Sequence, residues 1–453
     1  MEKNQFRLAD VILSVICVVF VAEAAAPVAS IGNSQYFWWG FMILAFLLPY
    51  GLIAAELGTA YAGDGGLYDW IHAAYPQGKW AARASWYYWI NFPLWMASLA
   101  VMCPELLRDI TGRQMGTIAS LAVQLLFIWI VTLIACYPVC DSIVILNVSA
   151  VIKILLALLV GGLGVWYISR YGFVNDMSAR TFLPSFDLTS LSYISVIIFN
   201  FLGFEVVCTF AGSMSEPKKQ IPQSIVTGGI VIAAIYLFSA FGIGAAVDVR
   251  EISVDSGLID AVSLILGADG GVLVAVVALL FLVTLFGNMI SWSMGVNSTA
   301  ALAADHNDMP RFFAKRWAKN NMPVGSAVAS GVCILGVLIE TVTPDSSLFW
   351  SFFALNLVML LLSYLPVFPA FLKLRRVDAK TPRPFRVPGS DAALRCIAYV
   401  PMALIIISII FTAVPLSFDA ETLKSFLPIT IGTILSAAIG EVLIALRGKT
   451  ARS

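Results

Sequence analysis

Three ionisable residues lie deep inside long apolar stretches of this sequence. Glu23 lies in the run 8–31, Lys153 in the run 142–168 and Glu205 in the run 190–213. An ionisable side chain inside a membrane-spanning segment marks a substrate or ion pathway, because the charge must find a partner away from water. Two buried acids and one buried amine can hold a charged solute and exchange protons, and together they predict the centre of a membrane transporter.

The first candidate segment is the run of five residues Glu23, Ala24, Ala25, Ala26 and Pro27. Proline lacks a backbone N–H and interrupts a helix, while three alanines let a ligand approach the main chain. We expect the helix to unwind near 23–27. Its freed carbonyls would then hold an ammonium group, and the next half-helix would face a carboxylate. The alternative is a proline kink in which Glu23 makes a structural hydrogen bond.

The second candidate segment contains Phe199, Asn200, Gly203 and Glu205. Glycine weakens a helix and permits close backbone approach, so a second interruption is expected here. The aromatic ring can close over a solute or stack on a cationic group. The alternative is a buried aromatic helix with one structural glutamate.

Lys153 is too deep in its run for the ammonium group to reach the membrane surface. It must bind a carboxylate, carbonyls or water, or else lose its proton. We therefore expect Lys153, with Glu205, to couple transport to an ion, either as a proton carrier or as a fixed positive charge in place of sodium. A purely structural ion pair is the alternative.

Further polar residues lie beside aromatic ones in other runs. Asn91 in the run 84–109 and Trp292 in the run 271–303 are candidates to line a substrate cavity, although packing is the alternative for each. Glu56, near one end of the run 36–60, is expected to brace the structure.

The remaining residue types give no argument for an enzyme, a metal site or a cofactor. The seven cysteines lack paired metal-ligand spacing, and the only two histidines, His72 and His306, lie near predicted loops. Gly65 and Gly66 are not followed by the Lys-Ser/Thr of a phosphate loop. Lys plus Arg and Asp plus Glu are both 27, so net charge predicts no nucleic-acid partner.

The composition is that of an integral membrane protein. Hydrophobic residues make up 60% of the 453 residues and charged residues only 12%, against about 25% charged in soluble domains. Twelve apolar runs are long enough to cross a bilayer of roughly 30 Å. Their approximate limits are 8–31, 36–60, 84–109, 116–136, 142–168, 190–213, 222–247, 271–303, 324–341, 347–372, 394–416 and 425–446.

The basic residues predict the orientation of these spans. If the N-terminus lies inside, the inner segments hold 20 of the 27 Lys and Arg residues and the outer segments hold six. Because basic residues concentrate on the cytoplasmic side, both termini are expected there. We expect a multi-pass protein of the plasma membrane, namely a bacterial inner membrane, whose first run is retained rather than cleaved.

The two candidate segments lie five runs apart. This offset predicts one polytopic domain, 1–453, in which 8–168 and 190–372 are inverted repeats and 394–446 holds accessory helices. Broken helices at matching positions of two halves point to a transport site.

Several motifs resemble the amino acid–polyamine–organocation superfamily of secondary transporters, and they do so over nearly the whole chain. They are Glu56-Leu57 followed by Gly65-Gly66-Leu67-Tyr68-Asp69-Trp70, then Phe201-Leu202-Gly203-Phe204-Glu205, Ser215-Glu216-Pro217-Lys218-Lys219, Ala303-Ala304-Asp305 with Met309-Pro310, and Arg383-Pro384-Phe385-Arg386-Val387-Pro388-Gly389. Their order and spacing together are specific.

The resemblance implies an all-α, LeuT-type fold in which helices 1 and 6 are discontinuous around an amino acid or amine. In similar transporters a lysine at the position of Lys153 replaces the sodium ion, which implies sodium-independent transport. Phe199 matches the aromatic gate of the family, and Glu205 matches an acid that links substrate binding to gating or protonation.

The first segment departs from the glycine-rich break of amino acid transporters. Glu23 followed by Pro27 is closer to the polyamine-uptake and glutamate–aminobutyrate exchanger branches. We expect a permease or exchanger that carries an amino acid or a derived amine by alternating access in the lipid bilayer. A proton-coupled polyamine importer is the first alternative, and a channel or substrate sensor is the second. The oligomeric state stays open.

Overall fold

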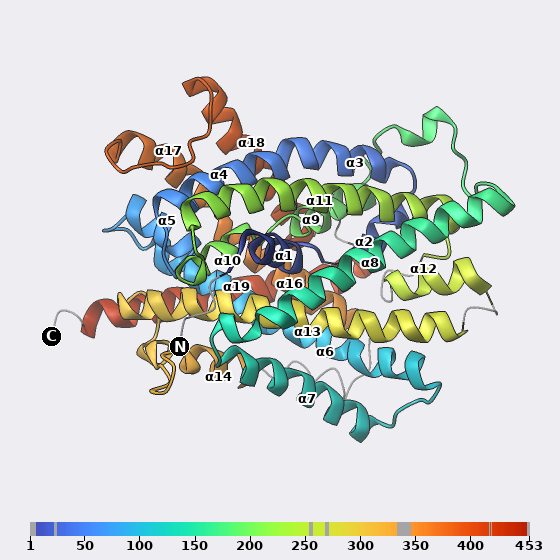
Figure 1. The fold of residues 1–453 in the computed structure, drawn as a ribbon, viewed down its shortest axis with the longest axis horizontal. Coiled ribbons are helices and arrows are strands. Elements are labelled where there is room, and N and C mark those ends of the chain that lie inside the picture. Colours follow the sequence, from blue (N-terminus) through green and yellow to red (C-terminus); the bar gives the residue numbers. More distant parts are fainter. Residues whose placement is uncertain are drawn as a thin grey trace.

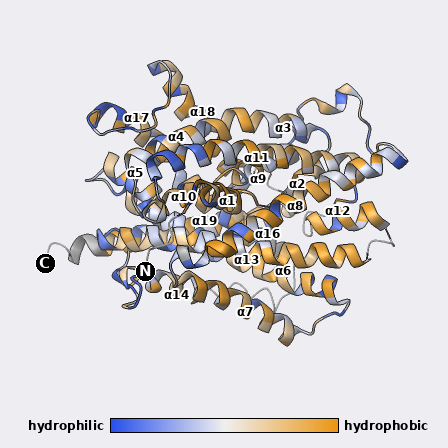
Figure 2. Cartoon of the chain, viewed as in Figure 1, coloured by the Kyte–Doolittle hydropathy of each residue, from blue (hydrophilic) through white to orange (hydrophobic). Residues whose placement is uncertain are grey.

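The computed structural model describes residues 6–21, 25–252, 257–267, 271–332, 346–415, 417 and 419–450. These residues form helices and connecting loops, and no strand occurs among them beyond one isolated bridge between Phe6 and Met214. Most of the long helices run side by side along the long axis (Figure 1). Apolar residues cover the helix middles and polar residues gather toward the ends, as expected for a bundle embedded in lipid (Figure 2).

Nine helical segments in the described part are long and apolar enough to cross a membrane. They are α3 to α4 (Ser34–Ala60), α6 (Trp80–Thr111), α7 (Thr117–Ala135), α8 (Val139–Tyr171), α11 (Pro217–Ala246), α13 (Gly271–Asp305), α16 (Ser346–Tyr364) with α17 (Val367–Val377), α18 (Asp391–Ala413) and α19 (Ala420–Thr450). The predicted runs 8–31 and 190–213 each form an interrupted helix. The predicted run 324–341 begins with α14 (Val324–Val332) and continues outside the described residues.

The first run is interrupted earlier than the sequence predicts. Helix α1 (Leu8–Val19) ends before Phe20, whose φ of −76° and ψ of 112° are extended. The next described helix, α2 (Ala25–Val28), contains Pro27, and the 3-10 turn η2 (Ala29–Ile31) follows it. Proline is tolerated in the first turn of a helix, so Pro27 lies inside the second segment rather than in the gap.

The sixth run is interrupted at the predicted glycine. Helix α9 (Leu188–Phe199) and helix α10 (Phe204–Cys208) are separated by residues 200–203. Gly203 has a φ of +120°, a conformation that L side chains rarely adopt. The chain can leave the helical conformation there because glycine permits that angle without strain.

Helices α3 (Ser34–Met42) and α4 (Leu48–Ala60) are joined by a π-helical turn, η3 (Ile43–Leu47). Pro49, in the first turn of α4, has no N–H with which to continue the regular ladder, so the turn before it takes a wider spacing. The result is one continuous span that carries Tyr50 and Glu56.

Two short elements lie at one end of the bundle. Helix α5 (Leu67–Ala74) and helix α17 share this end, while α12 (Gly257–Leu266) lies at the opposite end (Figure 1). We call the end of the bundle that holds α5 and α17 the α5/α17 end.

The chain just before α1 is tied to the segment that follows α10. The Phe6 amide donates to the Ser213 carbonyl at 2.8 Å, and the Phe6 carbonyl accepts from the Gln220 Nε2 at 2.9 Å. The two interrupted helices are therefore connected through the main chain.

Candidate functional site

Lys153 binds the end of α1 that the interruption leaves open. Its Nζ donates to the carbonyl of Cys17 at 2.7 Å, to the carbonyl of Phe20 and to the Oδ1 of Asn288 at 3.0 Å. Lys153 and Asn288 are fully buried and come from α8 and α13. The last carbonyls of a helix are a favourable place for a cation, because the peptide dipoles point their negative ends there.

Two more side chains satisfy the backbone at this interruption. The Trp292 Nε1 donates to the carbonyl of Val18 at 2.9 Å. The Tyr236 hydroxyl accepts from the amide of Val21 at 2.8 Å. The carbonyls of Cys17, Val18 and Phe20 therefore each accept a hydrogen bond from a side chain of the protein itself.

Glu205 is the centre of a second buried cluster. Its carboxylate accepts from the Tyr88 hydroxyl at 2.7 Å and from the Tyr50 hydroxyl. The ring of Tyr364 packs 5.5 Å from the ring of Tyr50 and 6.4 Å from that of Tyr88, while its buried hydroxyl has no hydrogen-bond partner among the described residues. Glu205 thus joins α10 to α4 and α6 through two fully buried tyrosines, and Tyr364 of α16 packs on the rings of both.

Gly203 brings the two interruptions together. A Cβ at this position would lie 2.8 Å from the Cγ1 of Val18 and 3.0 Å from the Cζ2 of Trp292. The backbone of the sixth run therefore passes close to the open end of α1, as a glycine at this point permits.

Four aromatic rings from four helices form one cluster. The Trp95 ring lies edge-on to Phe199 at 5.1 Å and to Trp292 at 5.5 Å, and Phe199 contacts Phe353 at 5.6 Å. Aromatic faces attract cations, and a buried indole N–H usually has a partner. In the described part of the chain the Trp95 Nε1 has none, so this donor is open to a solute or water.

The predicted site residues fall into three groups. Phe199, Gly203, Glu205 and Trp292 lie together at the interruptions, and Lys153 binds carbonyls at the end of α1.

Two buried asparagines border these groups. Asn91 donates to the Tyr88 carbonyl, while its Oδ1 finds no hydrogen-bond partner among the described residues. Asn200 is the first residue after α9 and is fully buried.

The other predicted residues lie in or beside α2. Glu23 and Ala24 are outside the described residues. Ala25 and Ala26 form the start of α2, and Pro27 is buried there.

The tyrosines around Glu205 and Tyr236 were not among the predicted site residues. A tyrosine in an apolar run is usually a packing residue with a hydroxyl that needs one partner, so each alone gives little indication of function. Four tyrosines facing two interruptions become visible only in the folded chain. Over the described residues, no group of three or more His, Cys, Asp or Glu side chains is placed to hold a metal ion.

Two interrupted helices, with a buried carboxylate and a buried ammonium group at the gaps, define a multi-pass membrane transporter rather than an enzyme. The chain belongs to the amino acid permease family, whose model matches residues 5–438.

Similar proteins are transporters as well. The chain is 59% identical over 443 residues to the probable agmatine/putrescine antiporter AguD of Lactococcus lactis, covering 98% of this chain and 95% of that one. It is 24% identical to a probable polyamine transporter of Arabidopsis thaliana, covering 89% and 79%. It is 21% identical to a glutamate/gamma-aminobutyrate antiporter of Lactococcus lactis, covering 82% and 76%.

Proposed function

We propose that this protein exchanges agmatine for putrescine across the membrane. The observation that carries the proposal is the 59% identity, over almost the whole of both chains, to a protein named as a probable agmatine/putrescine antiporter. The chemistry of the site residues supports this substrate pair, because a buried carboxylate and a cluster of aromatic faces suit an aliphatic solute that is cationic at both ends.

The solute would bind between the two interruptions. The residues proposed to contact it are Glu23, Ala24, Ala25, Ala26, Pro27, Asn91, Phe199, Asn200, Gly203, Glu205 and Trp292. Negative charge would come from Glu23 and Glu205, and the aromatic walls from Phe199 and Trp292. The Asn91 Oδ1 is supported as a contact because it is buried and open among the described residues.

Lys153 would make transport independent of sodium. Unwound carbonyls and polar side chains at a helix interruption are the ligands by which such folds bind Na⁺. Here the Lys153 ammonium group already holds two such carbonyls and an amide oxygen. A permanent positive charge at this place would remove the need for the ion.

The test is exchange in reconstituted vesicles. Vesicles loaded with putrescine should take up labelled agmatine at the same rate in sodium and in potassium or choline salts, while vesicles without internal substrate should take up little. Uptake that requires sodium would contradict the role of Lys153, and an absence of agmatine–putrescine exchange would contradict the substrate pair.

A proton-coupled amine importer is the alternative. It is distinguished by empty vesicles in which an inward proton gradient alone drives uptake. A channel would instead show conductance that does not saturate with solute concentration, and a sensor would bind solute without flux.

We further propose twelve spans in one domain of residues 1–453. Its inverted halves would be 8–168 and 190–372, with accessory helices at 394–446. Both termini would lie on the cytoplasmic side of the plasma membrane. The nine long helices and the two interrupted ones support this arrangement.

A further inference from the structure

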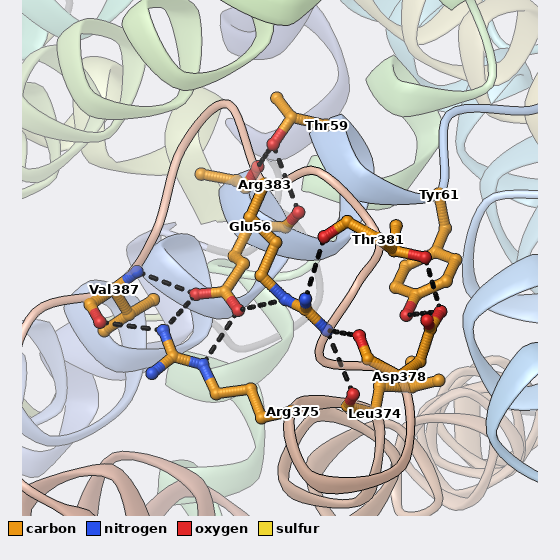
Figure 3. Close-up of polar contacts among 10 residues, drawn as sticks. Glu56, Thr59, Tyr61, Leu374, Arg375, Asp378, Thr381, Arg383 and Val387 are labelled. Atoms are coloured by element: carbon orange, nitrogen blue, oxygen red, sulfur yellow. Dashed lines mark hydrogen bonds and ion pairs between the residues drawn. The ribbon is translucent and has the colours of Figure 1, made fainter.

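A buried charge cluster lies at the α5/α17 end, apart from the proposed transport site. We call it the Glu56 cluster and define it as Glu56 of α4, Arg375 of α17, Arg383 and the backbone of Val387. The Glu56 side chain is 1% exposed, and those of Arg375 and Arg383 are 10% and 8% exposed. Figure 3 shows the carboxylate between the two guanidinium groups.

The Glu56 carboxylate has donors on every side. Its Oε1 accepts from the Arg375 Nε at 2.8 Å and lies 3.3 Å from the Arg383 Nε. Its Oε2 accepts from the Arg375 Nη2 and from the Val387 amide at 2.7 Å. A buried carboxylate is tolerated when charged partners and hydrogen bonds surround it in this way.

The same two arginines also bind the backbone of the segment that follows α17. The Arg375 Nη2 donates to the Val387 carbonyl at 2.7 Å (Figure 3). The Arg383 Nη2 donates to the carbonyls of Leu374 and Asp378, each at 3.0 Å, and so caps the end of α17. The segment 378–390 is thereby held against both α17 and α4.

Helix α4 carries this cluster and also a donor to Glu205. Tyr50 and Glu56 are six residues apart, which is about 9 Å along a helix. Tyr364, which packs on Tyr50, ends α16 only three residues before α17 begins. The two helical segments are therefore joined at two levels, once at the tyrosines around Glu205 and once at the Glu56 cluster.

We infer that Glu56 is a positioning residue, which keeps α4, α17 and the segment 378–390 together as one rigid unit throughout transport. It thereby holds Tyr50 at Glu205 and Tyr364 against Tyr50. Separation of α4 from these elements in each cycle would take three buried charges away from their oppositely charged partners, a penalty that favours a permanent attachment over a gate. The inference rests on the proposed function, because exchange is its main readout.

The first experiment uses cross-linking and leaves Glu56 in place. The Tyr61 hydroxyl donates to the Asp378 Oδ2 at 2.8 Å beside the cluster. Tyr61→Cys and Asp378→Cys, in a background without the native cysteines, are linked by a short bismaleimide. Linked protein is expected to exchange agmatine for putrescine at the rate of the unlinked protein. Exchange that stops on linking would overturn the inference, since α4 and α17 would then have to separate.

The second experiment is a double-mutant cycle with Glu56→Gln and Tyr50→Phe. Each variant is expected to slow exchange about tenfold, equivalent to about 1.4 kcal/mol, and the double variant is expected to be no slower than the slower single one. Effects that multiply would overturn the inference. The matched control is Glu441→Gln, which removes the ion pair with Arg83 between α19 and α6 and should leave exchange unchanged.

The same cycle measured on the thermal unfolding of purified protein needs no substrate. Non-additive shifts in the melting temperature are expected, and additive shifts would contradict the coupling of Glu56 to Tyr50. If the wild-type protein does not exchange putrescine, the proposed function fails, while this comparison still decides the role of Glu56.

Discussion

Lys153 on α8 binds groups of two other helices, namely the backbone carbonyls at the end of α1 and Asn288 of α13. Lys153→Ala would remove a donor from two buried carbonyls and from Asn288, and each buried group left without a partner costs about 1–3 kcal/mol. We expect agmatine–putrescine exchange to be lost while the protein still reaches the membrane, measured in reconstituted vesicles. Lys218→Ala, at an exposed position on α11, is the control. Unchanged exchange in the Lys153 variant would refute its role at the end of α1.

The tyrosines at Glu205 allow a closely matched pair of variants. Tyr88→Phe removes a single hydroxyl that donates to the carboxylate, whereas Tyr87→Phe changes the neighbouring residue, which packs among apolar side chains. A hydrogen bond to a charged group contributes about 1.5–3 kcal/mol, so the first variant should slow exchange about tenfold or more and the second should not. Equal effects would show that the hydroxyl at Glu205 has no special role.

Asp69 on α5 gives a prediction about pH. Burial raises the pKa of Asp69 to about 6, and its Oδ2 accepts from the Gly65 amide at 2.9 Å. Because the pKa in the unfolded chain is about 4, the contribution of this residue to folding stability falls as pH rises from about 4 to about 6.

Asp69→Asn keeps an oxygen for the Gly65 amide but removes the buried charge. Its melting temperature should therefore exceed that of the wild type at pH 7.5, by a free energy on the order of 2 kcal/mol, and the gain should vanish near pH 4. Thermal unfolding at both pH values measures this. A gain of the same size at both would rule out the ionisation of Asp69 as its source.

Among the elements, the interruption at Gly203 is the most sensitive to substitution. Gly203→Ala would place a side chain at a φ of +120° and against Val18 and Trp292. The conformation alone costs roughly 1–3 kcal/mol. We expect a lower melting temperature and slower exchange.

Gly162→Ala is the matched control for this substitution. It lies within α8, where an added Cβ would meet nothing within 4 Å, and alanine favours a helix more than glycine does. Its stability should be equal to or higher than that of the wild type. A greater loss at Gly162 than at Gly203 would contradict the backbone argument.

The two interruptions differ in how far the sequence could place them. The sequence indicates the position of the second interruption through Gly203 itself, because the conformational freedom of glycine is a local property. Pro27 predicted a break beside it, but α1 ends at Val19. The groups that stabilise this earlier end, Lys153, Tyr236 and Trp292, come from remote parts of the chain, so no local pattern could indicate it.

At the scale of the whole molecule, composition was sufficient to predict an all-helical membrane protein, because apolar length is a direct requirement of the bilayer. The contacts between helices were not predictable in the same way. The predicted topology put Glu56, Arg375 and Arg383 on the cytoplasmic side of the membrane. That they form one cluster depends on how α4 and α17 pack, which the sequence did not show.

Orientation is testable with two single-cysteine variants in a background without native cysteines. Arg113→Cys and Lys319→Cys are both at exposed positions, in connectors predicted to be outside and inside. On intact cells an impermeant maleimide should label the first, and it should label the second only after permeabilisation, because basic residues favour the cytoplasmic side. The reverse labelling pattern would invert the proposed topology.

The bridge at Phe6 has a consequence for how the transporter opens. Its hydrogen bonds fasten the start of α1 to the segment after α10 and to the first turn of α11. Helix α1 can therefore change its tilt in two ways. Either the hydrogen bonds of Phe6 break, or the segment after α10 and the first turn of α11 move together with α1, which loses no hydrogen bond. A tilt of the first helix would therefore displace three segments together, and we expect the amide of Phe6 to stay slow to exchange with deuterium throughout.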